Sequence, residues 1–161
     1  MNMTYAEATI ETLELIWDKN IRDNPDDPRW IRWKQQFIDY NTSGMAKTFM
    51  VLDDGNPVGE GTLLFSQDCK AIAGRPLLAN EKTANINALR IEKAYEGQGH
   101  ISRLVRLMET YAKEHGYERL TIGVEAQEAR NLAIYLHWGY QEFVMSEMDG
   151  DALVLYYAKN L

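Results

Sequence analysis

The spacing of apolar residues near the N-terminus predicts a short strand followed by two amphipathic helices. The strand covers residues 3–7. Thr9 is a suitable N-cap for the first helix, and Asp27 before Pro28 is a strong start signal for the second. The apolar positions that recur at helical spacing are Ile10, Leu13, Ile16 and Trp17 in the first helix, and Trp30, Trp33 and Phe37 in the second.

The next part of the chain changes to the alternating pattern of strands. Residues 47–52 and 57–65 are predicted to form a β-hairpin, because Asp53 to Asn56 supply the residue types that tight turns require. Residues 66–82 show no clear period, so we expect a long loop there, and long loops in compact domains are often functional.

From residue 84 the order is strand, loop, helix, strand. Residues 84–91 and 119–125 read as strands, and the helix between them starts at Ile101 and is closed by Gly116. This order implies one parallel strand pair. The remaining predicted elements are a short helix over 129–138 that stops at Gly139, and a last hairpin of 140–145 with 153–158.

These elements predict a single domain over residues 1–161, of the α/β (α+β) class. The central sheet should be mixed and mostly antiparallel, with about four helices flanking it. A chain of 161 residues fits one compact domain. The formal net charge of −7 disfavours nucleic acid as a partner, and no apolar run approaches the roughly 20 residues that span a membrane. The lone Cys69 cannot form an internal disulfide, which fits a cytoplasmic location.

The segment from Ile91 to Ser102 carries the most informative pattern. A strand runs into a loop that contains Gly97 and Gly99 and opens a helix. A helix start has free backbone N–H groups and a partial positive charge, so such a loop can hold a diphosphate without lysine. On the glycines alone, a tight strand-to-helix turn is the more common explanation. His100 and Ile101 after Gly99 do not match a P-loop or a Rossmann fingerprint, and a kinase glycine loop does not precede a helix.

The residues Glu96-Gly97-Gln98-Gly99-His100-Ile101 resemble the Arg/Gln-x-x-Gly-x-Gly/Ala motif of the GNAT superfamily of acetyltransferases. The resemblance extends to residues 8–13, 51–64 and 135–140, in the family's order and spacing. Glu96 replaces the usual Arg or Gln, and Ile101 replaces the final small residue. Arg103 and Arg106, one turn later, are expected to offset the charge of Glu96.

The resemblance implies the acyl-CoA N-acyltransferase fold and acetyl-CoA as cosubstrate. In that fold the strands 84–91 and 119–125 splay apart, and the pantetheine arm lies between them. The cofactor-binding residues implied are Leu89, Arg90, Ile91, Glu96, Gly97, Gln98, Gly99, His100, Ile101, Ser102 and Arg103, with Asn131 as a further candidate. No pair of histidines has metal-ligand spacing, so we expect no metal.

The same resemblance implies transfer of an acetyl group to an amine by direct attack in a ternary complex. Tyr135 aligns with the tyrosine that protonates the departing thiolate, although a core aromatic would fit the same position. Glu125 is a candidate base, or a solvated charge at a strand end; the small residues Thr121 and Gly123 on its face are expected to leave space for a ligand.

The acceptor implied is the primary amine of a small molecule. Trp30 and Trp33 are candidates for stacking on it, or for ordinary helix packing. Asn85 and Asn87 are candidates for orienting the acceptor or a water, because asparagine is unfavourable inside a strand; an edge or a bulge would also explain them. Acetylation of a peptide or protein amine, and a non-catalytic acyl-CoA sensor, remain alternatives. Homodimers are common in the family.

Overall fold

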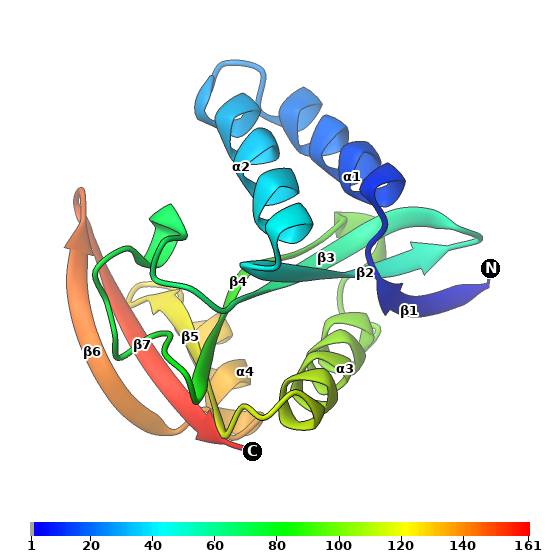
Figure 1. The fold of residues 1–161 in the computed structure, drawn as a ribbon. Coiled ribbons are helices and arrows are strands. Elements are labelled where there is room, and N and C mark those ends of the chain that lie inside the picture. The colour runs from blue at the N-terminus through cyan, green and yellow to red at the C-terminus, as the bar shows by residue number, and fades with distance from the viewer. Residues whose placement is uncertain (1) are drawn as a thin grey trace. The chain divides into compact units, whose positions relative to one another are not determined.

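The computed structural model describes residues 2–161 and divides the chain into two compact units (Figure 1). Unit 1 is Met1–Leu63 with Ala88–Met108, and unit 2 is Leu64–Asn87 with Glu109–Leu161. The helices and strands in chain order are β1 (Met3–Glu7), α1 (Ile10–Asp23), α2 (Arg29–Ser43), β2 (Ala46–Asp53), β3 (Asn56–Leu64), β4 (Thr83–Ile91), α3 (His100–Glu114), β5 (Arg119–Glu125), α4 (Ala129–His137), β6 (Glu142–Asp149) and β7 (Ala152–Asn160).

The strands belong to one seven-stranded mixed sheet in the order β1-β2-β3-β4-β5-β7-β6. The parallel neighbours are β4 and β5, whereas β1–β2, β5–β7 and β6–β7 pair antiparallel. This confirms the predicted mixed, mostly antiparallel sheet with four helices. Both β4 and α3 begin in one unit and end in the other.

Helix α1 starts where the sequence predicted. The Oγ1 atom of Thr9 accepts a hydrogen bond from the backbone N–H of Thr12 at 3.1 Å, and the Thr12 hydroxyl oxygen accepts one from the Thr9 N–H at 2.9 Å. The two residues therefore form a capping box, with threonine in place of the usual Glu or Gln.

Helix α2 also begins at its predicted signal. Pro28 already has helical angles, with φ −68° and ψ −12°, and Asp27 Oδ1 accepts a hydrogen bond from the backbone N–H of Arg29 at 3.1 Å. Asp27 therefore binds the first N–H of α2, and Pro28 occupies the N-cap position directly before the helix, where its missing N–H costs nothing.

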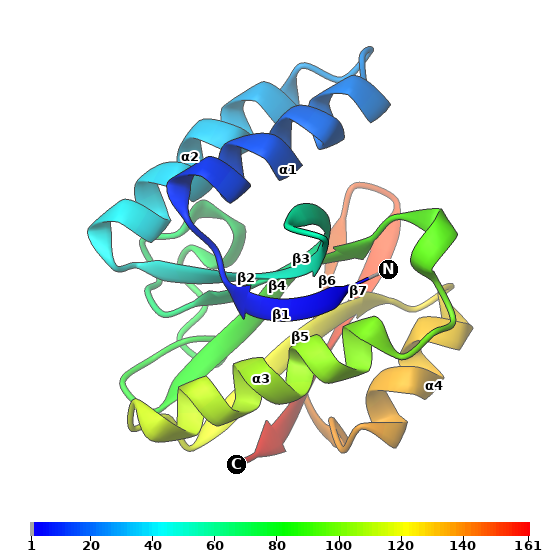
Figure 2. The ribbon, with the colours of Figure 1, turned by 90° about the vertical axis from the view of Figure 1, so that its right-hand side faces the viewer.

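Aromatic side chains join the two helices, which lie side by side in both views (Figure 1, Figure 2). The Trp17 ring lies 5.1 Å from Phe37 and 6.1 Å from Trp30, and Trp30 lies 5.0 Å from Trp33. Trp17 and Phe37 are buried, so they contribute to the core of unit 1.

The β2–β3 hairpin closes through Asp54 and Gly55, both with positive φ of 49° and 82°. This is the pair of left-handed residues that a type I′ turn needs, and it confirms the predicted turn. On β3, a Cβ placed at Gly61 would lie 2.8 Å from Leu89 and 2.9 Å from Met108, so only glycine lets these side chains approach the strand.

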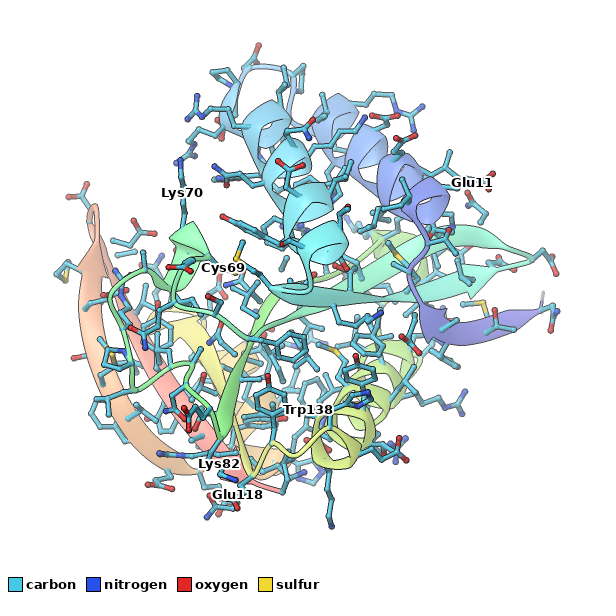
Figure 3. The ribbon with its side chains drawn as sticks, viewed as in Figure 1. Glu11, Cys69, Lys70, Lys82, Glu118 and Trp138 are labelled. Atoms are coloured by element: carbon cyan, nitrogen blue, oxygen red, sulfur yellow. The ribbon has the colours of Figure 1, made fainter. Side chains whose placement is uncertain are left out.

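Unit 2 is built on the strands β5, β7 and β6 and on the first half of β4. Pairing of β4 with β5 runs from Thr83↔Arg119 to Ile86↔Ile122. At its start, the backbone N–H of Glu118 donates to the carbonyl of Lys82 at 2.8 Å, and Figure 3 shows these two side chains close together.

The predicted long loop before β4 contains a single short 3-10 turn, Lys70–Ile72. Several of its residues pack against or bond to other parts of unit 2. Its residues Ile72 and Leu78 are buried. Arg75 Nε donates to Glu147 Oε2 on β6 at 2.7 Å, and the Leu78 carbonyl accepts a hydrogen bond from Thr121 Oγ1 at 2.8 Å. The loop is therefore held by specific bonds, although its sequence has no regular period. Across residues 2–161, no helix has both the length and the apolar character that crossing a membrane requires.

Candidate functional site

The loop between β4 and α3 presents an open, glycine-lined helix start. Gly97 has φ 73° and Gly99 has φ 84°, and the carbonyl of Gly99 accepts the first helical bond, from the Arg103 N–H at 3.1 Å. A Cβ built at either glycine would meet no described heavy atom within 4 Å. Backbone conformation, not crowding, therefore requires glycine here, and the space beside the first turn is open to a ligand.

Two side-chain anchors fix this loop within unit 1. Lys19 on α1 donates to Glu92 Oε1 at 3.0 Å and to the carbonyl of Pro57 at 2.7 Å. The Tyr95 hydroxyl donates to Asp53 Oδ2 at 2.6 Å, and this hydrogen bond to a carboxylate raises the pKa of Tyr95. The backbone of the loop is thus positioned before any ligand arrives.

The imidazole ring of His100, the first residue of α3, forms hydrogen bonds with other residues of the protein. The imidazole is buried, with Nδ1 2.7 Å from the Tyr5 hydroxyl and Nε2 3.2 Å from Gln98 Oε1. Both ring nitrogens are therefore engaged, and the group of His100 that can still face a phosphate is its backbone N–H. Glu96 and Arg103 are exposed, and Arg103 also reaches the Tyr5 hydroxyl at 3.4 Å.

Strand β4 contains an irregularity that the sequence did not predict. Ala88 has a positive φ of 54°, which is uncommon for a residue with a side chain. Ile86 is the last residue of β4 that pairs with β5. Ala88 lies two positions after it, directly before the predicted cofactor-binding segment Leu89–Ile91. A left-handed residue inside a strand redirects the backbone that comes after it.

Arg90 takes part in an ion pair that sequence reasoning missed. Its Nε atom donates to Glu60 Oε2 on β3 at 3.3 Å, and its guanidinium carbon lies 5.0 Å from the centre of the Trp30 ring. The available signal was Glu60 itself, the one charged residue in the 57–65 segment. Trp30 and Trp33, the predicted acceptor residues on α2, are half-buried.

Tyr135 lies on α4 in unit 2 and is half-buried. Its ring is 5.6 Å from that of Trp138, and among the described residues its hydroxyl has no hydrogen-bond partner. Burial raises the pKa of the Tyr135 phenol, and the negative charge of Glu128 raises it further. The phenol therefore keeps its proton at neutral pH, which suits a proton donor.

Glu125 and Asn131 are held by their neighbours in sequence. Glu125, the last residue of β5, is half-buried and accepts a hydrogen bond from Gln127 Nε2 at 2.9 Å. Asn131 is exposed on α4, and its amide donates to Glu128 Oε2 at 3.0 Å.

The space expected beside Thr121 and Gly123 is filled by protein atoms, so that expectation was wrong. A Cβ at Gly123 would lie 2.7 Å from Cε1 of the Tyr156 ring, and the Thr121 hydroxyl is bonded to the Leu78 carbonyl. Glycine at position 123 makes room for an aromatic side chain of β7 rather than for a ligand.

The two asparagines of β4 have different surroundings. Asn85 is buried, and its Nδ2 donates to Thr121 Oγ1 at 3.0 Å, so it links the two parallel strands. Asn87 is half-buried, directly before the left-handed Ala88.

The predicted site residues thus fall into two sets. Unit 1 contains the glycine loop, the Leu89–Ile91 segment, Trp30 and Trp33; unit 2 contains the remaining candidates. These are Asn85, Asn87, Glu125, Asn131 and Tyr135. Among residues 2–161, no group of three or more His, Cys, Asp or Glu could hold a metal ion.

A strand leads through an open glycine turn into a helix start, in a mixed sheet with one parallel pair, and this geometry is suited to a diphosphate-containing cofactor. Comparison with known proteins makes the class specific. The model of the acetyltransferase (GNAT) family matches residues 9–140. The chain belongs to this family, and it is therefore an acyltransferase that uses acetyl-CoA.

Solved structures share the fold at low sequence identity. An N-acetyltransferase from Staphylococcus aureus Mu50 aligns with a TM-score of 0.73 and 16% identity, covering 99% of both chains. The PaiA N-acetyltransferase from Thermoplasma acidophilum, in complex with coenzyme A, gives 0.68 and 16% over 100% of both chains. An acetyl transferase from Salmonella typhimurium that modifies the N-terminal serine of ribosomal protein L7/L12 gives 0.72 and 15%, covering 100% of this chain and 96% of that one. No curated protein sequence gives a match.

Proposed function

We propose that this GNAT acetyltransferase transfers the acetyl group of acetyl-CoA to the primary amine of a small molecule, by direct attack in a ternary complex. The observation that carries the proposal is the open helix start at Gly97 and Gly99, fixed by Lys19 and Tyr95. Acetyl-CoA supplies a diphosphate for this main chain and a thioester for the amine.

The main chain supplies the binding and charge-stabilising groups. The backbone N–H groups from Gly97 to Ser102 hold the diphosphate, because the first turn of α3 leaves them without helical partners. A backbone N–H of the Leu89–Ile91 segment donates to the oxygen on which negative charge develops. The left-handed Ala88 supports this role, since it redirects the strand just before that segment.

Side chains of unit 2 donate and accept the protons of the reaction. Tyr135 donates a proton to the departing thiolate, a role supported by its hydroxyl, which is protonated at neutral pH and has no hydrogen-bond partner among the described residues. Glu125, or a water that it orders, accepts a proton from the acceptor amine. The engaged imidazole of His100 orients the loop through Tyr5 and Gln98 instead of binding phosphate itself.

Ligand stabilisation and turnover test the proposal separately. Acetyl-CoA and CoA should raise the melting temperature, and ATP should not, because a ligand that binds only the folded state stabilises it. Release of CoA thiol with a panel of small amines should then exceed release with peptides. Binding without thiol release would establish a sensor, and turnover with peptides alone would establish a peptide acetyltransferase. An absence of stabilisation by either CoA ligand would refute the proposal.

Two glycines make a matched pair for testing the loop. Gly99 and Gly55 have nearly the same positive φ, 84° and 82°, and each has open space where a Cβ would stand. Alanine at either position should cost about 1–2 kcal/mol of stability, because a side chain disfavours the left-handed region. Only Gly99→Ala should also weaken acetyl-CoA binding, by about tenfold or more, as measured by calorimetry. Equal affinity in the two variants would place the diphosphate elsewhere.

A further inference from the structure

Glu60 is a buried carboxylate that is only partly satisfied. Its side chain is 1% exposed, on a strand whose neighbours are apolar or small. The Oε2 atom accepts hydrogen bonds from Asn20 Nδ2 at 2.8 Å and from Arg90 Nε at 3.3 Å. The Oε1 atom is buried and has no partner among the residues that the structure describes.

Arg90 is held in place but has donors left over. Its guanidinium carbon lies 5.1 Å from the centre of the Trp17 ring and 5.0 Å from that of Trp30, so the two indoles and Glu60 fix its orientation. Its Nη2 atom is buried without a partner within residues 2–161, and the same is true of Trp17 Nε1. One third of the Arg90 side chain, 33%, is exposed although Nη2 itself is buried, so the guanidinium stands at the boundary between the buried cluster and solvent.

Three unpartnered buried polar atoms in one cluster are costly for a folded protein. Each such atom gives up its hydrogen bonds to water without replacement, and the loss is larger for charged groups. Arg90 Nη2 and Trp17 Nε1 each need an acceptor, whereas Glu60 Oε1 needs a donor. A ligand that carries a carboxylate next to an N–H group satisfies both demands. An amine without a carboxylate leaves the guanidinium unsatisfied.

We infer that Arg90 binds a carboxylate of the acceptor, and that the acceptor is a small amine that carries a carboxylate, of the class of the free amino acids. This inference rests on the proposed function. Arg90 belongs to the Leu89–Ile91 segment assigned above to the thioester oxygen, so an acceptor bound to its side chain is tied to the reacting strand. A planar guanidinium held on one edge and on its faces presents its remaining donors in a fixed geometry suited to a carboxylate. Glu60, Trp17 and Trp30 act through Arg90 and are positioning residues.

The first test compares acceptors that differ only in the carboxylate. The common amino acids and their amides are assayed by thiol release, and their binding to the protein saturated with CoA is measured by calorimetry. The best amino acid should exceed its amide in kcat/KM by about 10- to 100-fold, the range expected for a charge-assisted hydrogen-bond pair. Equal or better use of the amides, no binding of any amino acid, or a preference for peptides with amidated ends would overturn the inference.

The second test changes the cluster. Arg90→Gln alone leaves Glu60 as an unpaired buried charge, so it is paired with Glu60→Gln in a double variant that removes both charges. Arg32→Gln, an exposed arginine on α2 of the same unit, is the control. The double variant should use the amino acid and its amide equally well, whereas the control should keep the preference for the amino acid. Loss of both substrates in equal proportion, or an unchanged preference, would reduce Arg90 to a structural residue.

The two proposals fail in different ways. If acetyl-CoA neither stabilises the protein nor supports thiol release, the proposed function fails. Calorimetry of the amino acids and their amides on the protein without CoA still decides whether Arg90 recognises a carboxylate.

Discussion

Two tyrosines of unit 2 allow catalysis to be separated from stability. The Tyr140 side chain is fully buried, and its hydroxyl donates to Glu109 Oε2 at 2.7 Å. The Tyr135 hydroxyl, in contrast, has no hydrogen-bond partner among residues 2–161. Replacing each by phenylalanine removes the hydroxyl oxygen and leaves the ring. The two variants therefore compare the loss of a hydrogen-bonded hydroxyl with the loss of an unbonded one.

The structure sets the expected sizes of the effects. Tyr140→Phe should lower the free energy of unfolding by about 1.5–3 kcal/mol, the range for a hydrogen bond to a charged group. Glu109 keeps Lys159 as a partner at 3.0 Å, so the variant should still fold. Tyr135→Phe should change stability by less than about 0.5 kcal/mol, because no hydrogen bond is lost. Its kcat should fall by about 100-fold, the lower end for loss of a general acid.

Denaturant unfolding and thiol release measure the two quantities on the same preparations. Acetyl-CoA affinity, measured by calorimetry, should be unchanged in Tyr135→Phe. In the natural protein kcat should not decline below pH 10 through loss of this proton, because the pKa of Tyr135 is raised above 10 by burial. Turnover of Tyr135→Phe within a few-fold of the natural protein would show that Tyr135 is a packing residue only. A loss of kcat in Tyr140→Phe as large as in Tyr135→Phe would show that the assay reports folding.

Three further predictions concern stability. Thr9→Ala removes Oγ1, the acceptor of the Thr12 N–H, while the bond from the Thr9 N–H to Thr12 remains; it should cost about 0.5–2 kcal/mol in urea unfolding, and no change would mean that this cap bond contributes nothing. Gly123→Ala places a Cβ 2.7 Å from the Tyr156 ring and should cost about 1–3 kcal/mol, with a shift in the tyrosine near-ultraviolet signal. Burial and the bond to Glu147 raise the pKa of Tyr156 to about 12, so its contribution, complete below pH 10, should be lost as pH rises from 10 through 12; Tyr156→Phe should flatten this decline in unfolding experiments.

The helices and turns of this protein can be predicted from short local patterns in its sequence. Thr9 and Asp27 mark the starts of α1 and α2, because a short polar side chain just before a helix can accept a hydrogen bond from one of its first N–H groups. Asp54-Gly55 closes a hairpin, since both residues tolerate positive φ. Gly99 opens α3 for the same reason. These signals need only neighbouring residues, and together with the motif they were enough to predict the family.

The tertiary structure alone decided which side chains remain available to a ligand. Sequence spacing placed His100 in the phosphate loop, but Tyr5, from 95 positions away, engages its ring. The sequence also predicted free space beside Gly123, but the Tyr156 ring fills it. The pairing of Glu60 with Arg90 has no local signature in either strand. A periodic pattern reports whether a position is buried, because burial depends on one face of one element. The identity of its partner depends on which distant segment packs there, and this information exists only once the chain has folded.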